Sequence, residues 1–93
     1  MIRTFGDKDT ARLFRREVVP RWGPDIQHLA LRRLRKLDAA ATLDDLRVLP
    51  GNRVEKLRGD RAGRWSIRVN RQWRLCFRWE GGNAYDVELV DYH

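Results

Sequence analysis

The C-terminal half of this 93-residue chain alternates apolar and polar residues with a period of two, and this pattern constrains the fold more than any other feature. Alternation of this kind is typical of β-strands that bury one face and expose the other. The alternating segments span 64–69, 73–79 and 85–90. Residues 53–58 form a further candidate strand. We therefore expect a sheet of three to four mainly antiparallel strands.

The N-terminal half predicts two helices. Asp7 is placed to cap the first, over about residues 8–18, and Pro20 would end it because proline disfavours helical geometry in the residue before it. Asp25 is placed to cap the second, over about residues 26–40, whose apolar residues recur at helical spacing. Both helices can cover the apolar face of the sheet.

Shorter elements flank these two helices. Residues 1–5 predict a short extended opening, and Thr42 with Asp45 resembles a capping box, which predicts one more helical turn over 43–46. The chain length suits one domain. We expect a single α+β domain over 1–93, with the two N-terminal helices packed on one face of the sheet.

The alternation also predicts the strand register, because a slip of one residue would exchange the two faces of a strand. Three-residue loops at 70–72 and 81–83 keep both apolar sets on the same face. The expected core pairs are Trp65 with Phe77, Ile67 with Leu75, Val69 with Trp73, Trp79 with Tyr85, Phe77 with Val87, and Leu75 with Leu89.

The opposite face of the predicted sheet is crowded with arginine. The same register places Arg64 across from Arg78 and Arg68 across from Arg74, although like charges directly opposed destabilise a sheet. Asp86, expected across from Arg78, relieves one end only. An array of uncompensated arginines on a sheet is what the phosphate backbone of a nucleic acid would neutralise.

The net charge agrees with this interpretation. The chain has 20 basic and 13 acidic residues, a formal net charge of +7, and 17 of the basic residues are arginine. Residues 53–78 carry nine basic and two acidic residues, so their net charge equals that of the whole chain. Arginine grips phosphate with a planar fork and stacks on bases. The same arginine content is compatible with arginine-rich coding without functional pressure, and with a solvated face whose arginines splay apart.

The composition disfavours several classes of protein. Cys76 is the single cysteine, so we expect neither an intramolecular disulfide nor a cysteine-based zinc site. The two histidines, His28 and His93, have no partner at metal-ligand spacing, and we expect no metal or other cofactor. No segment is apolar enough for a signal peptide or a membrane span, so we expect a cytoplasmic protein without membrane contact.

His93, the last residue, is a candidate for acid–base chemistry because histidine titrates nearest neutral pH. Cleavage of RNA without a metal needs a base for the 2′-hydroxyl, a cation for the phosphate and an acid for the leaving oxygen. The alternative is a frayed chain end with no role. His28 lies beside the apolar stripe of the second predicted helix, and we interpret it as structural or exposed.

A set of short motifs runs along nearly the whole chain. The most specific combination is Gly59-Asp60-x-x-Gly63-x-Trp65-Ser66 with the ending Asp91-Tyr92-His93. Further motifs are the opening Met1-Ile-Arg-Thr-Phe, Leu13-Phe14, Leu57-Arg58, Trp73-Arg74 with Phe77, and Ala84-Tyr85-Asp86. Together they resemble the HigB branch of the RelE/ParE toxin superfamily.

This resemblance implies a function and a set of partners. HigB-type proteins are toxins of type II toxin–antitoxin systems, so it implies a ribosome-dependent endoribonuclease that cleaves messenger RNA in the ribosomal A site and inhibits translation. It implies neutralisation by a HigA-type helix-turn-helix antitoxin, through which alone the toxin would reach operator DNA.

The resemblance also implies roles for single residues. Arg74 matches the family's arginine that stabilises the transition-state phosphate, His93 its C-terminal histidine, and Tyr92 the tyrosine before it. Arg58 stands where the family often has a lysine, and it keeps the charge but cannot donate a proton.

One position departs from the family pattern. The best-known members read His-Pro just upstream of Leu57, whereas this chain reads Glu55-Lys56. Glu55 is a candidate base, as carboxylates are in other metal-free ribonucleases, but a surface residue paired with Lys56 or a nearby arginine is the alternative. The residues expected to hold RNA are Lys56, Arg64, Arg68 and Arg78.

Two further functions are compatible with the same fold. A ParE-like toxin would inhibit DNA gyrase without catalysis, and His93 would then be irrelevant. A nucleic-acid-binding accessory protein would help an antitoxin repress its operon and would not be toxic. A fold by itself does not separate these functions from a nuclease.

Overall fold

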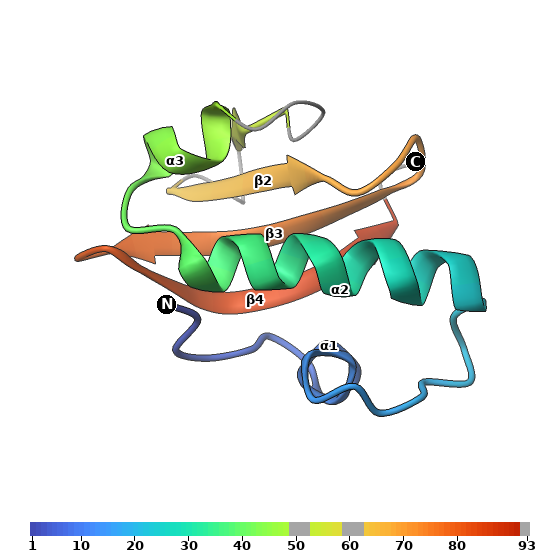
Figure 1. Ribbon diagram of the computed structural model, residues 1–93. Coiled ribbons are helices and arrows are strands. Elements are labelled where there is room, and N and C mark those ends of the chain that lie inside the picture. Colours follow the sequence, from blue (N-terminus) through green and yellow to red (C-terminus); the bar gives the residue numbers. More distant parts are fainter. Residues whose placement is uncertain (49–52, 59–62, 92–93) are drawn as a thin grey trace.

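The computed structural model describes residues 1–48, 53–58 and 63–91 (Figure 1). Its elements in chain order are α1 (Lys8–Phe14), α2 (Pro24–Ala39), α3 (Leu43–Arg47), β1 (Glu55–Lys56), β2 (Arg64–Arg68), β3 (Trp73–Glu80) and β4 (Asn83–Asp91). The four strands form one antiparallel sheet in the order β1-β2-β3-β4. The predicted α+β class is confirmed, and α2 runs along one face of the sheet.

The first hairpin has the predicted register. Trp65 pairs with Phe77 and Ile67 with Leu75, and the backbone N–H of Val69 donates to the Trp73 carbonyl at 3.0 Å. The arginine pairs are also confirmed, since Arg64 pairs with Arg78 and Arg68 with Arg74. The first predicted strand is shorter than expected, because only Glu55 and Lys56 of residues 53–58 pair with β2.

The second hairpin corrects the predicted register. Its loop is Gly81-Gly82, not three residues, because both glycines adopt the positive φ that a two-residue type I′ turn requires. Asp86, with a φ of 54°, lies in the bulge that absorbs the extra residue. Tyr85 therefore pairs with Arg78, and the predicted pair of Tyr85 with Trp79 was wrong.

Beyond this bulge the strands return to the predicted register. Leu75 pairs with Leu89, whereas regular pairing is interrupted at Phe77, which was expected opposite Val87. All four side chains still belong to the main core. The bulge thus changes the faces of β4 only between the turn and Asp86.

The outer edge of β4 is occupied by the N-terminal segment. Ile2 and Phe5 form parallel bridges to Ala84 and Val87, so the expected extended opening continues the sheet. Further along, the Leu89 N–H donates to the buried Thr10 hydroxyl at 3.0 Å, which ties α1 to the same edge. An edge strand with satisfied backbone groups is a poor template for aggregation.

Helix α1 is shorter than predicted. Asp7 caps it, accepting from the Thr10 N–H at 2.6 Å, but the helix ends at Phe14 instead of near Val18. Arg16 has a φ of 65°, which turns the chain out of the helix. Val18 is 80% exposed as a result.

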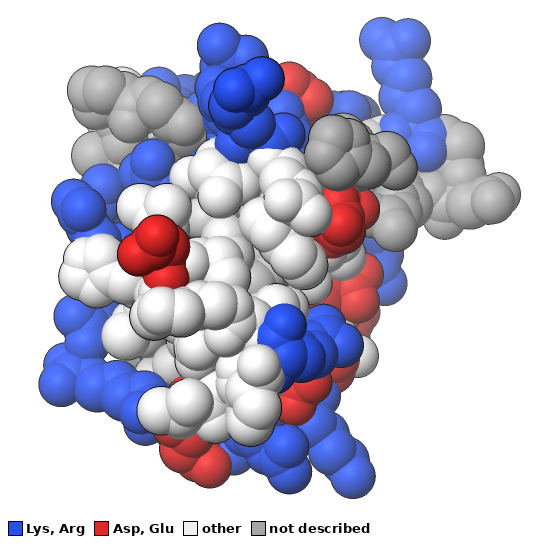
Figure 2. Space-filling view, turned by 90° about the vertical axis from the view of Figure 1, so that its right-hand side faces the viewer, with Lys and Arg blue, Asp and Glu red and all other residues white. Residues whose placement is uncertain are grey.

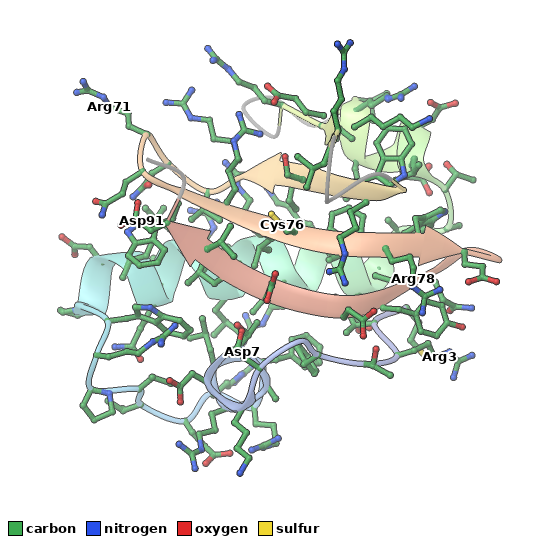
Figure 3. All side chains as sticks on the ribbon, turned by 180° about the vertical axis from the view of Figure 1, so that it is seen from behind. Arg3, Asp7, Arg71, Cys76, Arg78 and Asp91 are labelled. Carbon is green, nitrogen blue, oxygen red and sulfur yellow. The ribbon has the colours of Figure 1, made fainter. Side chains whose placement is uncertain are left out.

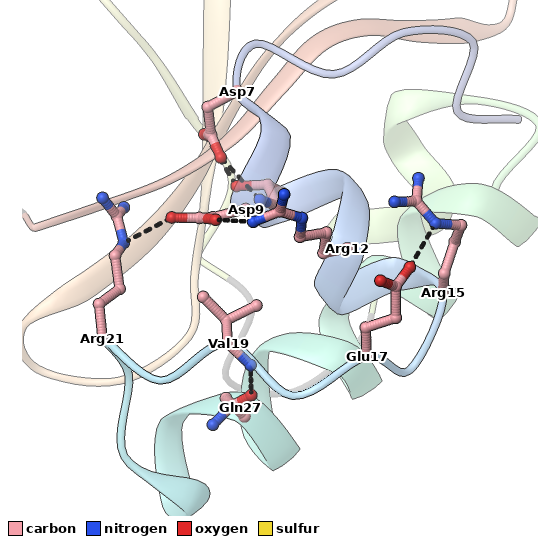
Figure 4. Close-up of polar contacts among 9 residues, drawn as sticks. Asp7, Asp9, Arg12, Arg15, Glu17, Val19, Arg21 and Gln27 are labelled. Carbon is pink, nitrogen blue, oxygen red and sulfur yellow. Dashed lines mark hydrogen bonds and ion pairs between the residues drawn. The ribbon is translucent and has the colours of Figure 1, made fainter.

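Residues 17–23 instead follow the core, where Val19 and Trp22 are buried. Figure 4 shows how the segment is held: Gln27 accepts from the Val19 N–H at 2.8 Å, and Arg21 lies 3.3 Å from Asp9. Gln27 also donates to the Trp22 carbonyl. Burial of two large apolar side chains outweighed the helical spacing that predicted a longer α1.

Helix α2 begins two residues earlier than predicted. Gly23 is the N-cap and Pro24 the first helical residue, because the fixed φ of proline suits that position. Asp25 is not the cap but lies in the first turn, where its negative charge interacts favourably with the positive end of the helix dipole. The buried side of α2 packs on β3 and β4 through Ile26, Ala30, Leu34 and Leu37.

Helix α3 confirms the predicted capping box. The Asp45 N–H donates to the Thr42 hydroxyl at 3.2 Å, and the Asp45 carboxylate accepts from the Thr42 N–H at 3.0 Å. Leu46 anchors this turn in the core. In the described segments, no helix combines the length and the apolar character needed to cross a membrane.

The capping box predicts a pH-dependent contribution to stability. Hydrogen bonds from the Thr42 and Ala41 N–H groups hold the pKa of Asp45 below its ordinary value. Because the folded pKa is the lower one, the contribution is complete above about pH 4 and is lost as the pH falls through the folded pKa. We expect Asp45→Ala to lower the melting temperature at neutral pH, and the difference from the wild type to shrink as the pH falls below about 4.

Thermal unfolding followed by circular dichroism at a series of pH values measures this difference. Asp44→Ala is the matched control, because Asp44 is on the same helix and pairs with Arg47 without taking part in the cap. A constant difference between wild type and Asp45→Ala over the whole pH range would contradict the assignment.

Candidate active site and nucleic-acid interface

The face of the sheet opposite α2 carries Arg64, Arg68, Arg74 and Arg78, and we call it the arginine face. Figure 3 shows the sheet from this side, with Cys76 near its middle, Arg78 toward one end and Asp91 at the other. Arg64 and Arg68 are four residues apart on β2, so the two ends of this face are separated by about 13 Å.

Arg74 is the most enclosed of these arginines, with a side chain only 12% exposed. Its guanidinium donates to the Ser66 hydroxyl at 3.0 Å and to the Arg53 carbonyl at 3.4 Å. It also donates to a carboxylate oxygen of Glu55 at 3.2 Å. These contacts from β2, β1 and the residue range before β1 hold the Arg74 guanidinium in one orientation.

Glu55 is the exposed partner in this arrangement, because 51% of its side chain is accessible to solvent. It pairs with Ser66 across β1 and β2, which aims its carboxylate at Arg74. A carboxylate and a phosphate make the same bidentate contacts with arginine. Glu55 contacts the Arg74 guanidinium through one carboxylate oxygen, a contact that a phosphate oxygen can also make.

Arg64 and Arg78 form a second cluster at the other end of the face. One oxygen of Asp86 lies 3.7 Å from Arg64 and 3.6 Å from Arg78. Arg78 also pairs with Glu80, and its guanidinium carbon is 4.7 Å from the centre of the Tyr85 ring. The bulge at Asp86 produces this cluster, because it brings Tyr85 onto the arginine face.

The expectation of uncompensated arginines on this face was wrong for Arg74, whereas Arg68 forms no ion pair within the described residues. Asp86 bridges Arg64 and Arg78 together, and Glu55 compensates Arg74. Arg68 donates to the Asn70 carbonyl at 3.2 Å. Exposed ion pairs contribute about 0–1 kcal/mol, so the pairs that Arg78 makes with Asp86 and Glu80 are weak.

The middle of the arginine face is closed. Ser66 and Cys76 pair across β2 and β3 and are fully buried. Leu57 is also buried, and its N–H donates to the Arg64 carbonyl at 2.9 Å. These side chains form a small buried group apart from the main core, and they separate the two charged clusters.

The structure places the other predicted site residues less centrally. Lys56 pairs with Trp65, so it lies on the opposite face from Glu55, with its ammonium 6.0 Å from the Trp65 ring. Arg58 is exposed just after β1. Tyr92 and His93 lie outside the described residues.

Strand β4 ends close to Arg74. Val90 pairs with Arg74, and β4 ends one residue later at Asp91, which pairs with Trp73. The Asp91 carboxylate accepts from the Gln72 side chain at 2.9 Å. The described part of β4 therefore ends beside Arg74 and not beside Arg78.

Sequence reasoning missed Ser66, and it placed Asp86 directly across from Arg78, where the structure has Tyr85. Ser66 orients Arg74, and its position across from Cys76 in the predicted register could have revealed it. Asp86 bridges two arginines, and the double glycine at 81–82 is the signal for the turn that moves it. Within the described ranges, no group of three His, Cys, Asp or Glu side chains is placed to hold a metal ion.

Solved structures of other proteins share this fold. The YoeB–YefM complex from Staphylococcus aureus matches with a TM-score of 0.62 over 100% of this chain and 98% of that chain, at 14% identity. A YoeB/ParE toxin from Agrobacterium tumefaciens matches with a TM-score of 0.61 over 99% and 98%, at 16% identity. The chain thus has the α+β fold of RelE-like toxins.

Sequence comparison narrows this class to one family. The HigB-like toxin family, described as the RelE-like toxin HigB of type II toxin–antitoxin systems, matches residues 3–93. Toxin HigB-1 of Vibrio cholerae is 48% identical over 64 residues, which are 69% of this chain and 67% of that protein. Endoribonuclease HigB of Proteus vulgaris is 35% identical over 100% of both chains. The chain belongs to the HigB-like toxin family, and its partner is an antitoxin.

The geometry predicts that Glu55 competes with phosphate for Arg74. We expect Glu55→Gln to bind a short RNA more tightly than the wild type, by up to about fivefold, because the variant removes the negative charge beside the guanidinium. A 2′-deoxy-blocked oligonucleotide, which cannot be cleaved, allows the affinity to be measured by fluorescence anisotropy.

Glu17→Gln is the matched control, since it removes an exposed carboxylate that pairs with Arg15, and neither residue belongs to the arginine face. Equal gains for both variants would indicate a general charge effect. Weaker binding by Glu55→Gln would overturn the competition.

Proposed function

We propose that this toxin is a ribosome-dependent endoribonuclease that cleaves messenger RNA without a metal and so inhibits translation. Membership of the HigB-like family and the likeness to a relative named Endoribonuclease HigB support this activity. The observation that carries it here is the Arg74 guanidinium, enclosed by Ser66 and β1 and facing the exposed carboxylate of Glu55.

Arg74 is the group proposed to stabilise the transition state. A guanidinium stays protonated, so Arg74 can neutralise the charge that grows on the phosphate but cannot exchange a proton. Its fixed orientation means that it needs little reorganisation when that charge appears. Arg58 is proposed to add a second positive charge beside the same phosphate.

Proton transfer is proposed for Glu55 and His93. Glu55, as base, would take the proton of the 2′-hydroxyl, and the 2′-oxygen would then attack the adjacent phosphorus. The bond to the 5′-oxygen breaks, His93 donates a proton to that oxygen, and a 2′,3′-cyclic phosphate and a 5′-hydroxyl remain. Tyr92, which precedes His93, is proposed to stack on a base at the cleavage site.

RNA binding is proposed for the rest of the arginine face. Arg68 lies beside Arg74, and the cluster of Arg64 and Arg78 lies about 13 Å away along the sheet. These groups would hold the message on either side of the scissile phosphate. Lys56, on the other face of β1, would contact RNA only at the edge of the sheet.

The partners proposed beyond an antitoxin are the ribosome with its messenger RNA and an antitoxin of the HigA type. Operator DNA would be contacted only through that antitoxin, and the site of action is the cytoplasm. Gyrase inhibition is the less favoured function, because the family match is to HigB-like toxins. A supercoiling assay with purified gyrase tests it directly.

A translating extract tests the nuclease proposal. We expect the wild type to cut the message, and Arg74→Ala to cut it about 10²–10³-fold more slowly, because an oriented charge at the transition state is lost. Glu55→Gln and His93→Ala should each slow cutting by about 10²–10⁴-fold. Primer extension maps the cut sites.

Glu17→Gln is again the control and should cut at the rate of the wild type. An intact message with the wild type would contradict the proposal. Cutting that is unaffected by Arg74→Ala combined with His93→Ala would contradict the assigned residues.

A further inference from the structure

Four residues lie together beside the Gly81-Gly82 turn, and we call Arg64, Arg78, Tyr85 and Asp86 the turn cluster. Tyr85 pairs directly with Arg78, so both side chains lie on the arginine face, at the end where Figure 3 labels Arg78. The guanidinium carbon of Arg78 lies 4.7 Å from the centre of the Tyr85 ring, and 42% of the Arg78 side chain is exposed. A second flat group can therefore stack on this guanidinium from the solvent side.

The Asp86 carboxylate supplies hydrogen-bond acceptors beside this stack. Its Oδ2 atom lies 3.6 Å from Arg78 and 3.7 Å from Arg64, and both distances exceed the about 2.7–3.2 Å of an N–H···O hydrogen bond. Among the residues that the structure describes, no group donates a hydrogen bond to this carboxylate. With 41% of its side chain exposed, Asp86 keeps acceptor capacity for a ligand that lies on Arg78.

The N-terminal segment fixes Asp86 in this position. Asp86 has a φ of 54°, a left-handed conformation that is strained for residues other than glycine. Its N–H donates to the Thr4 hydroxyl at 2.8 Å, across 82 positions of the chain, and the Val87 N–H donates to the Thr4 carbonyl at 3.1 Å. Gly6 permits this approach, because a Cβ there would lie 3.1 Å from the Asp86 carbonyl oxygen. Strained residues that the surrounding structure holds in place are concentrated at functional sites.

A second aspartate also lies between two arginines, but its carboxylate is closed. One oxygen of Asp9 lies 3.3 Å from Arg12, and the other lies 3.3 Å from Arg21 (Figure 4). Only 26% of the Asp9 side chain is exposed. Arg21 also covers a ring, that of Trp22, which is buried. Both oxygens of Asp9 are thus engaged by arginine, whereas Asp86 has only the two longer contacts at one oxygen.

The opposite end of the sheet presents a different surface. Figure 2 views the molecule from the side that lies at the right of Figure 1, where the chain passes from α1 to α2. Uncharged side chains fill the centre of this view, and Lys and Arg lie mainly around its border. Among the described residues, the centre of this side therefore carries no counterpart of the turn cluster.

The chemistry of the turn cluster matches one RNA base best. Bases stack on guanidinium planes and on aromatic rings, which suits Arg78 and Tyr85. Guanine has two adjacent donors, N1–H and the N2 amino group, which one carboxylate can accept together, and its O6 atom is an acceptor. Asp86 can accept from both donors, and Arg64, 33% exposed beside it, can donate to O6. Uracil has a single N–H between two carbonyl groups, so it suits a carboxylate poorly.

We propose that the turn cluster is a guanine-binding subsite for the message. The base stacks on Arg78 over the Tyr85 ring, and Asp86 holds its Watson–Crick edge. The inference rests on the proposed function, which places RNA on the arginine face. Arg78 and Arg74 are four residues apart on β3, so about 13 Å separates the subsite from the cleavage site. This distance corresponds to about four nucleotides of a stacked strand, whose phosphates are about 3.4 Å apart, and to fewer of an extended one.

Binding of short RNAs that cannot be cleaved tests the subsite. Each 2′-deoxy-blocked oligonucleotide of a set contains uracil throughout except for one guanine, which is moved one position at a time on either side of the blocked bond. We expect the wild type to bind the RNA with guanine at one of these positions about fivefold or more tightly than the all-uracil RNA. Fluorescence anisotropy measures both affinities.

The ratio of these two affinities is the readout, because removing a negative charge raises the affinity for every RNA. Asp86→Asn should abolish the guanine preference, since an amide has one acceptor oxygen, while asparagine still adopts the positive φ. Tyr85→Leu should reduce the preference, because the guanidinium loses its aromatic support. Asp9→Asn is the matched control and should keep the preference, because it removes a carboxylate that also lies between two arginines.

Circular dichroism shows which variants are folded, and Tyr85→Leu decides the test if Asp86→Asn is not. A wild type that binds every RNA of the set equally, or none of them, would overturn the subsite. So would a guanine preference that persists in the folded Asp86→Asn and Tyr85→Leu variants, or one that Asp9→Asn abolishes as well.

The translating extract separates this inference from the nuclease proposal. A guanine preference that depends on Asp86, in a protein that leaves the message intact, would support the subsite and contradict the nuclease. A message that the wild type cuts, together with equal binding of every oligonucleotide, would do the reverse.

Discussion

The antiparallel register between β2 and β3 is the constraint on which the rest of this structure depends. It pairs Ile67 with Leu75 and keeps the apolar side chains of both strands on the face that α2 covers. A slip of one residue would turn those side chains to solvent and bring the arginine face inward. Burying unpaired guanidinium groups costs several kcal/mol each. The register that forms the core is therefore also the one that places the candidate site on the exposed face.

The arginine face and α2 differ in the ion pairs that their basic residues form. On the arginine face, Asp86 lies near Arg64 and Arg78, which stay partly exposed, and Glu55 pairs with the largely enclosed Arg74. On α2 the basic residues have no acidic partner within the described chain.

Two local irregularities carry much of the remaining architecture. The Gly81-Gly82 turn with its bulge at Asp86 moves Tyr85 onto the arginine face and lets one carboxylate serve two arginines. The left-handed residue Arg16 ends α1 early, so that Val19 and Trp22 can reach the core. Neither feature interrupts the hydrophobic pattern on which sequence-based prediction depends.

The sequence by itself determined the α+β class, the arginine pairs across β2 and β3, and the caps at Asp7 and Thr42, because periodicity and capping depend on near neighbours along the chain. It also contained the motifs of the HigB-like family. Only the tertiary structure decided which arginines are neutralised. Glu55 reaches Arg74 across 19 positions, and such a contact follows from folding and not from any local pattern.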